Sequence, residues 1–178
     1  MIKLNLGSGE NKIEGFVNVD AEPLTSPDLC LDFRYEKLPY EENTVDEIWI
    51  LHCIEHVERR YWDDLFKHLR TILKPQGLFV LSYPEFSVCA DNFITNRNDN
   101  REFWHATLYG RQLYGTDYHV TAIDTPELKQ ILFSHGFYGI NSKPEVGQAF
   151  NTTLVCRKSP PELMVDKEKI LVKEMGLK

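Results

Sequence analysis

No two cysteines in this sequence have the C-x-x-C spacing that marks a structural zinc site or a redox motif. Two of the four cysteines lie within apolar runs, as small core residues do. This usage excludes a disulfide-rich secreted domain and indicates a reduced, cytoplasmic chain without disulfides or a structural zinc. The two in apolar runs are Cys30 and Cys156, and the others are Cys53 and Cys89.

Long apolar runs are also missing. None approaches the ~20 residues that span a bilayer, and the first residues lack the basic and apolar regions of a signal peptide. An excess of positive charge is missing as well, since the net charge is −7. We therefore expect neither a membrane nor a nucleic acid as a general partner.

What remains is an ordinary globular composition without internal repeats. The 178 residues are 42% hydrophobic and 26% charged, enough for a substantial core. We predict a single domain over residues 1–178. Seven strand-like runs are expected, at residues 2–6, 16–20, 28–32, 45–51, 78–83, 137–142 and 149–157.

Two helices are predicted between these runs. Apolar residues recur at three-and-four spacing from Arg59 to Leu73, as on one face of a helix. A second helix begins at Asp124, with a proline in its first turn, and ends at Gly136. The alternation of strands and helices predicts an α/β fold with a mainly parallel sheet.

The end of the sheet differs from this alternation. The last two strands follow each other directly, joined by a turn that contains Pro144 and Gly147. We expect them to form an antiparallel hairpin at one edge of the sheet.

Two segments lie outside the repeat. Residues 84–123 form an insertion of ~40 residues rich in aromatics, longer than a loop usually runs without a functional reason. The apolar pattern of residues 162–178 predicts a short amphipathic helix. It is expected to pack on the body of the domain or on a second copy of the chain, as in a homodimer.

The beginning of the chain carries the first functional signal. An apolar run breaks into Gly7-Ser8-Gly9, and a second run, Phe16 to Val19, ends in Asp20. Glycines two apart allow a sharp turn that presents bare N–H groups, and a carboxylate after the next strand suits a ribose. This arrangement is typical of nucleoside binding in a doubly wound sheet.

Further motifs follow in the order seen in one family. The chain resembles a class I S-adenosylmethionine-dependent methyltransferase of the small, Rossmann-like type. The motifs are Leu4-Asn5-Leu6-Gly7-Ser8-Gly9, Asp20, Asp32-Phe33, the segment Leu38-Pro39-Tyr40-Glu41-Glu42-Asn43-Thr44-Val45-Asp46, His52-Cys53-Ile54-Glu55-His56 and Leu73-Lys74-Pro75-Gln76-Gly77. The resemblance implies a Rossmann-like, doubly wound, mainly parallel seven-stranded sheet.

The same resemblance implies how S-adenosyl-L-methionine is held. The glycine loop would contact the cofactor, Asp20 would bind the ribose, and Asp32 would meet the adenine amino group. Alternatives stay open: the glycines as plain turn residues, Asp20 as a solvated acid and Asp32 as a turn cap. The implied cofactor-binding residues are Asn5, Leu6, Gly7, Ser8, Gly9, Asp20, Asp32, Phe33, Leu51 and His52.

Two features depart from the family pattern. Asn5 stands where an acidic residue usually orients the glycine loop. The link between the first two strands has about nine residues, too short for an ordinary helical crossover. We expect one turn of helix around Asn11 to Glu14. An antiparallel second strand is an alternative that would overturn the assignment.

The stretch His52-x-x-Glu55-His56 also matches the inverted zincin motif. On a helix, two imidazoles four residues apart would share a face and bind zinc. The segment follows a strand directly, however, and no third ligand is evident in the sequence. We therefore predict no metal, with Glu55 and His56 fixing the loop.

The insertion resembles the acceptor side of related small methyltransferases. His119 is the candidate catalytic base, because an imidazole titrates near working pH. Its alternative is a packed histidine among aromatics. The predicted acceptor-binding residues are Trp104, Tyr109, Arg111 and Tyr118.

Together these features predict methyl transfer from S-adenosylmethionine to a small-molecule acceptor by in-line displacement. Two alternatives remain at this point. One is a catalytically silent module that binds S-adenosylmethionine or another nucleotide, and the other is a zinc hydrolase that uses His52, Glu55 and His56.

Overall fold

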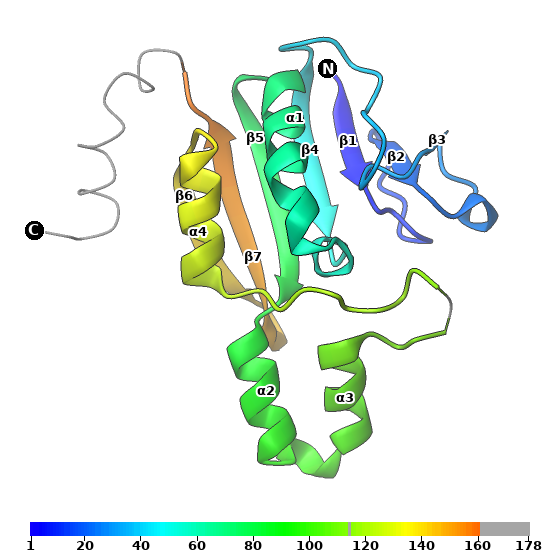
Figure 1. Ribbon diagram of the computed structural model, residues 1–178, viewed down its shortest axis with the longest axis vertical. Helices are drawn as coiled ribbons and strands as arrows, with labels where there is room; N and C mark the ends of the chain where they lie inside the picture. Colours follow the sequence, from blue (N-terminus) through cyan, green and yellow to red (C-terminus); the bar gives the residue numbers. More distant parts are fainter. Residues whose placement is uncertain (114, 161–178) are drawn as a thin grey trace, which may run out of the picture.

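A computed structural model describes residues 1–113 and 115–160. The described chain forms one seven-stranded sheet in the order β3-β2-β1-β4-β5-β7-β6 (Figure 1). Neighbours from β3 to β5 pair in parallel, whereas β7 runs antiparallel to both β5 and β6. The strands are β1 (Lys3–Leu6), β2 (Val17–Asp20), β3 (Leu29–Cys30), β4 (Val45–Leu51), β5 (Leu73–Pro84), β6 (Phe137–Glu145) and β7 (Gln148–Lys158).

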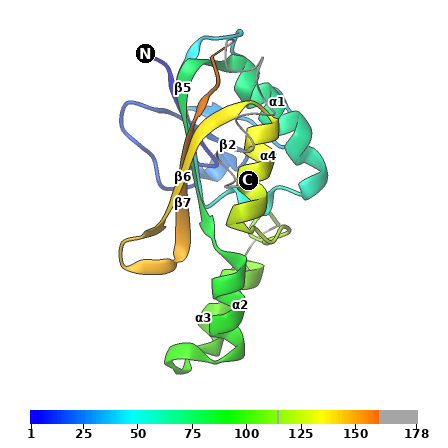
Figure 2. The ribbon, with the colours of Figure 1, turned by 90° about the vertical axis from the view of Figure 1, so that its left-hand side faces the viewer.

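Two helices cover the sheet on the same face. Figure 2 views the sheet nearly edge-on and shows α1 (Trp62–Ile72) and α4 (Thr125–Ser134) on one side of it. Helix α1 follows β4, and α4 precedes the terminal hairpin. The other two helices are α2 (Phe86–Ile94) and α3 (Arg101–Tyr109), which lie beyond the end of the sheet.

The core lies between this helical layer and the sheet. Helix α1 buries the apolar stripe that its spacing predicts, including Trp62, Phe66 and Leu69. These side chains meet strand residues such as Ile48 and Phe79, both fully buried. Helix α4 begins as the sequence predicts, because Asp124 accepts a hydrogen bond from the Glu127 N–H as its N-cap.

The predicted fold class is confirmed. The sheet is Rossmann-like and mainly parallel, with the antiparallel pair at its C-terminal edge. Strand β2 pairs in parallel with β1, so the antiparallel alternative for the second strand does not apply. Helices are distributed unevenly, because the described residues between β1 and β3 contain only the 3-10 turn Pro23–Thr25.

The helical turn predicted around Asn11 to Glu14 is wrong. Asn11 to Ile13 are irregular, and a turn follows at Glu14 and Gly15, where Gly15 has a φ of +78°. Side chains replace the hydrogen bonds that a helix would make: Asn5 donates to the Asn11 carbonyl, and the Asn18 Oδ1 accepts from the Ile13 N–H. The short link is therefore held by side-chain amides rather than by a helix.

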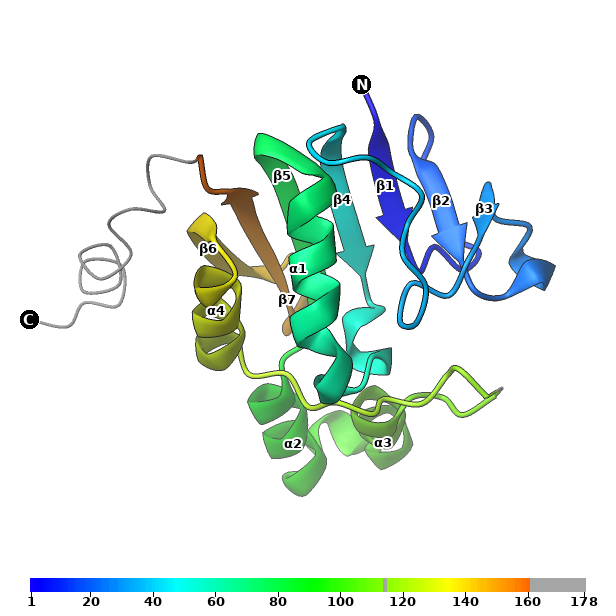
Figure 3. The same ribbon diagram turned by 45° about the horizontal axis from the view of Figure 1, so that its top comes forward.

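The insertion begins and ends at neighbouring points. The Phe86 N–H donates to the Ile123 carbonyl (3.0 Å), and the Glu85 carboxylate accepts from the Thr125 hydroxyl and N–H. Between these points, α2 and α3 pack against each other with Trp104 buried. Figure 3 shows the arrowheads of β1, β2 and β4 at the sheet edge that faces these helices. The helix predicted over 162–178 lies outside the described residues.

Two further expectations concern cysteines and membranes. Cys156 is buried as predicted, but Cys30 is exposed, because it lies in the two-residue edge strand β3. All four cysteines are free thiols. Among the described helices, none has both the length and the apolar composition needed to cross a bilayer.

Candidate functional site

The candidate site lies where the strand order reverses. Strands β1 and β4 are neighbours, and the chain continues outward from them in opposite directions, to β2 and to β5. In open α/β sheets, ligands bind outside the carboxyl ends of the strands at such a point. Here that edge carries the glycine loop after β1, Asp20 at the end of β2 and His52 after β4.

The glycine loop turns back onto β2. The N–H groups of Gly7 and Ser8 both donate to the Val19 carbonyl, at 2.8 and 3.1 Å. Gly7 has a φ of +69°, and a Cβ there would lie 2.0 Å from the Cys53 Sγ. Position 7 therefore requires glycine for two reasons: its φ is positive, and the Cys53 side chain approaches it closely.

Asp20 holds the loop in place. One carboxylate oxygen accepts the Gly9 N–H at 2.7 Å, and the other accepts the Glu22 N–H at 2.8 Å. A carboxylate has about four lone-pair positions, so both oxygens can accept a further hydrogen bond. The carboxylate thus both shapes the loop and remains able to bind a diol.

Asn5 and Asn18 form a buried amide pair beneath the loop. The Asn5 Nδ2 donates to the Asn18 Oδ1 (3.0 Å) and to the Asn11 carbonyl (3.1 Å). The Asn18 Nδ2 in turn donates to Asp28 (2.9 Å). Because both partners of Asn5 are acceptors, a carboxylate at position 5 would lack donors there. The amide that departs from the family pattern therefore suits this short link.

Two features of the loop fit a bound polar ligand. The Ser8 hydroxyl belongs to a residue that is 3% exposed, and it has no hydrogen-bond partner. A Cβ built on Gly9 would meet nothing within 4 Å, although its φ is +48°. An orphaned buried hydroxyl beside open space fits the methionine and ribose end of S-adenosylmethionine.

Asp32 is already engaged by a neighbour. Its two carboxylate oxygens accept from the Arg34 guanidinium, at 2.8 and 2.7 Å, and one also accepts the Arg34 N–H. Burial raises the pKa of Asp32, but the Arg34 hydrogen bonds and charge outweigh it, and the pKa is lowered. These contacts agree with the capping interpretation, and the adenine contact stays a prediction. Phe33 is buried and faces Gly7.

His52 follows Leu51 at the end of β4 in the left-handed region, with φ +50°. Its Nε2 lies 3.1 Å from the Ser82 Oγ and 3.5 Å from a Glu145 oxygen. Burial lowers the pKa of His52, but Glu55 and Glu145 outweigh it and raise the pKa overall. Ser82 and Glu145 were missed in the sequence, because no local pattern links residues so far apart in the chain.

A small cavity lies on the insertion side of this edge. Its volume is about 170 Å³, and it is lined by Glu55, Tyr109 and His119 together with residues of α2, of α3 and of the irregular segment 120–123. Burial lowers the pKa of His119, which favours the neutral imidazole. The cavity therefore brings a neutral imidazole and a phenol to one side of the cofactor edge.

The other predicted acceptor residues are not gathered there. Trp104 is 4% exposed, packs on Phe150 and lines a separate cavity of about 450 Å³ between α2, α3 and the β6–β7 turn. Arg111 lies 3.6 Å from Asp117, and Tyr118 is half exposed. The structure thus brings Tyr109 and His119 together and leaves Trp104 in the small core of the insertion.

The inverted zincin geometry is not formed. Only Ile54–His56 is helical, as a 3-10 turn, and His52 lies before it at the end of a strand. His52 and His56 therefore do not share a helical face, which that motif needs.

Comparisons with known proteins agree with the fold. Residues 14–81 match the model of a family described as a methyltransferase domain. This stretch contains Asp20, Asp32 and His52 and begins after the glycine loop. A search of curated proteins finds no sequence match.

Several solved structures share the fold at low identity. A SAM-dependent methyltransferase from Archaeoglobus fulgidus has a TM-score of 0.64 and 14% identity, over 88% of this chain and 85% of that one. A possible exported protein from Bordetella parapertussis has a TM-score of 0.62 and 12% identity, over 89% of this chain and 62% of that one. The third is a phosphoethanolamine N-methyltransferase from Haemonchus contortus in complex with S-adenosyl-L-methionine. It has a TM-score of 0.59 and 12% identity, over 90% of this chain and 49% of that one. The chain thus spans about half to two thirds of the last two.

Proposed function

We propose that the chain is a class I S-adenosylmethionine-dependent methyltransferase and that it methylates a small-molecule acceptor bound on the insertion side of the cofactor. The observation that carries this proposal is the cavity between the cofactor edge and the insertion, which contains His119 and Tyr109. A volume of about 170 Å³ suits a metabolite or one reacting group rather than a folded macromolecule. The acidic net charge of −7 also disfavours a nucleic-acid acceptor.

The cofactor would be held by the loop and the two strand ends beside it. The Ser8 hydroxyl and the open side of Gly9 would take polar groups of S-adenosylmethionine, and Asp20 would accept from the ribose diol. Leu51 and His52 would line the pocket after β4. When bound, the cofactor supplies an activated methyl group on a sulfonium, so the protein mainly has to position the acceptor and exclude water.

His119 would remove the proton that a hydroxyl or amine acceptor loses. Its lowered pKa keeps it in the basic form at neutral pH, and its ring lines the cavity. Tyr109 would contact the acceptor from the end of α3. Arg111 and Tyr118 are exposed residues of the same insertion and would contact the acceptor from outside the cavity.

The organisation of the chain belongs to this proposal as well. Residues 1–178 would form a single methyltransferase domain, with 84–123 as the acceptor-side insertion. The insertion carries exposed apolar side chains, such as Ile94 and Leu113, which favour contact with a second copy of the chain. Four free thiols support a reducing, cytoplasmic environment.

The test is an acceptor screen that measures S-adenosylhomocysteine release with chemically defined pools of metabolites, peptides and nucleic acids. We expect turnover with a metabolite pool only. Tyr109→Phe should raise KM for the acceptor identified there, whereas His119→Ala should lower kcat by about 100-fold or more. Cofactor binding without turnover in any pool would instead support the silent module, and turnover with nucleic acid would overturn the small-molecule proposal.

A further inference from the structure

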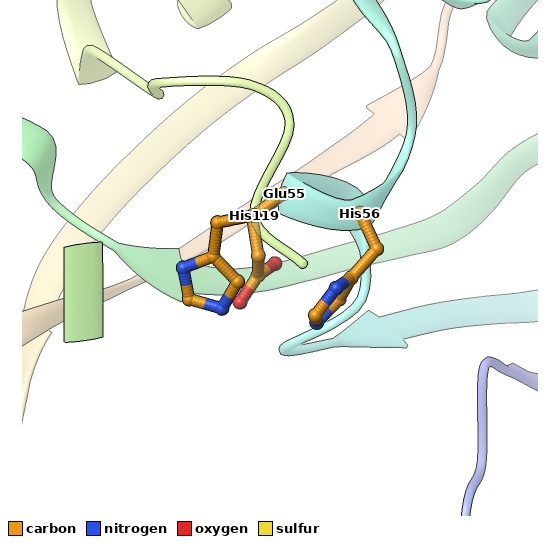
Figure 4. A group of neighbouring side chains, drawn as sticks. All are labelled: Glu55, His56 and His119. Atoms are coloured by element: carbon orange, nitrogen blue, oxygen red, sulfur yellow. The ribbon is translucent and has the colours of Figure 1, made fainter. Parts of the chain in front are cut away.

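We propose that Glu55, His56 and His119 form a binding site for one divalent transition-metal ion. One ligand atom from each of these side chains lies within 4.8 Å of the other two. Figure 4 shows the Glu55 carboxylate between the two imidazole rings. Two histidines and one carboxylate form a frequent donor set for catalytic zinc and for non-haem iron.

Two segments far apart in the chain form this cluster, and hydrogen bonds fasten them together. Glu55 and His56 belong to the 3-10 turn after β4, whereas His119 comes from the end of the insertion. The Glu55 carbonyl accepts the N–H groups of Val120 (2.9 Å) and Thr121 (3.2 Å). The backbone therefore fixes His119 opposite Glu55 before any ligand binds.

The carboxylate has an unused oxygen. Glu55 is 2% exposed, and its Oε2 is buried without a hydrogen-bond partner. Its Oε1 lies 3.8 Å from the His52 Nδ1, too far for a hydrogen bond. A buried carboxylate oxygen without a donor is costly, and a cation between it and the imidazoles would remove that cost.

The His56 imidazole is oriented as a metal ligand usually is. The His56 Nδ1 donates to the Tyr118 carbonyl at 2.9 Å, which leaves a lone pair on Nε2. Metal-bound histidines almost always donate their second N–H to a carbonyl or carboxylate in this way.

The donor set limits the ion. Imidazole favours zinc, iron, cobalt and nickel over magnesium or calcium, which prefer oxygen ligands only. Around zinc, ligand atoms lie about 2.0–2.2 Å from the metal and so about 3.3 Å from each other. The three side chains would therefore close by up to about 1.5 Å, within the reach of χ rotations.

Such a site would leave coordination positions open toward the cavity that Glu55 and His119 line. A metal-bound hydroxyl loses its proton at a lower pH than a free one, so an acceptor oxygen on the ion would need no protein base. The free lone pair of His119 would then be a metal ligand rather than a base. This consequence rests on the proposed function, but the metal site itself does not.

The experiment uses the full chain stripped of metal with a chelator and free of cofactor. Co²⁺ is titrated and followed by its visible d–d absorption, and Zn²⁺ then competes for the same site. We expect one Co²⁺ per chain, displaced by one Zn²⁺. His56→Ala and His119→Ala should each weaken binding by at least about 100-fold. His105→Ala, an exposed histidine of α3 outside the cluster, is the matched control and should bind as the wild type does.

Glu55→Gln keeps the shape of the side chain and removes its charge, and it should also weaken binding. If that variant does not fold, the Co²⁺ affinities of the two histidine variants test the metal site. No visible absorption at stoichiometric Co²⁺, or wild-type affinity for Co²⁺ in both His56→Ala and His119→Ala, would overturn the proposal. Binding of S-adenosylhomocysteine to the metal-free chain is measured in parallel, so failure of the metal site is separated from failure of the methyltransferase proposal.

Discussion

The two halves of the sheet are stabilised by different interactions. Around β4 to β6, helices α1 and α4 bury large apolar side chains against the sheet. Around β1 to β3, the described chain has no α-helix, and buried amides and a carboxylate fix the loops instead. The first side depends on hydrophobic burial, and the second depends on satisfied hydrogen bonds.

The difference predicts how each side responds to change. Apolar packing tolerates the absence of a ligand, because its stabilisation comes from area removed from water. The β1–β3 side has an orphaned hydroxyl at Ser8 and open space at Gly9, so part of its stabilisation would come from the bound cofactor.

Truncation of one phenylalanine on each side tests the comparison directly. Phe66 is fully buried in α1, and Phe66→Ala should lower the free energy of unfolding by about 3–5 kcal/mol. Phe16, partly buried on Trp49 next to β1, should cost under about 2 kcal/mol when truncated. Urea unfolding measures both, and equal losses would contradict the proposed difference.

The two glycines of the loop separate packing from ligand contact. Alanine at Gly7 would need a positive φ and would collide with Cys53, so a loss of about 2–4 kcal/mol is expected. Alanine at Gly9 meets open space, so stability should fall by only about 1–2 kcal/mol from the positive φ. Affinity for S-adenosylhomocysteine, measured by calorimetry, should fall for Gly9→Ala. Unchanged affinity would remove Gly9 from the cofactor site.

The amide pair offers a polar counterpart. Asn18→Ala leaves the Asn5 amide and the Ile13 N–H without their acceptor, at a cost of about 2–3 kcal/mol. Asn141→Ala, at an exposed residue of β6 with one local hydrogen bond, is the control and should change stability by under about 0.5 kcal/mol. Similar thermal shifts for the two variants would show that the network does not support the loop.

The smallest effect is a pH dependence at His52. The pKa of Glu145 is lowered from 4.5, so its contribution is present above about pH 4.5 and is lost as the pH falls. The pKa of His52 is raised from 6.5, so its contribution is present below about pH 6.5 and is lost as the pH rises. Their joint contribution is therefore largest between these values. His52 is 42% exposed, so solvent screening keeps it under about 1 kcal/mol.

Glu145→Gln should flatten this part of the stability curve, measured as Tm from pH 4 to pH 8. Lys143, two residues before Glu145 on the same strand, offers a control as Lys143→Gln. A Tm profile that keeps its shape in Glu145→Gln would exclude the ion pair.

Much of this fold follows from local patterns in the sequence. The helix over α1, the capped start of α4 and the glycine turn after β1 were predicted from spacing, caps and turn residues. The predicted turn of helix at Asn11 to Glu14 was wrong, because the competing hydrogen bonds come from Asn5 and Asn18. Propensity along a short link does not reveal such partners.

The candidate site could be predicted only in part from the sequence, for the same reason. Residues next to a motif, such as Asp20 and His52, could be chosen from the sequence. The contact of Cys53 with Gly7 and the approach of His119 to Glu55 arise when distant segments meet. From the sequence, His52 and His56 were weighed as zinc ligands without a third. The cluster in the structure instead joins Glu55 and His56 to His119, which lies on the insertion more than sixty residues later.

We propose that the β1–β3 side of the sheet, which has no α-helix, binds S-adenosylmethionine through its glycine loop and Asp20. Isothermal titration of S-adenosylhomocysteine into the wild type and Asp20→Ala tests it most directly, with Asp63→Ala, an exposed acid of α1, as the control. The account predicts saturable 1:1 binding that Asp63→Ala retains and that Asp20→Ala weakens by about 100-fold or more. Equal affinity in all three proteins, or no binding to the wild type, would contradict it.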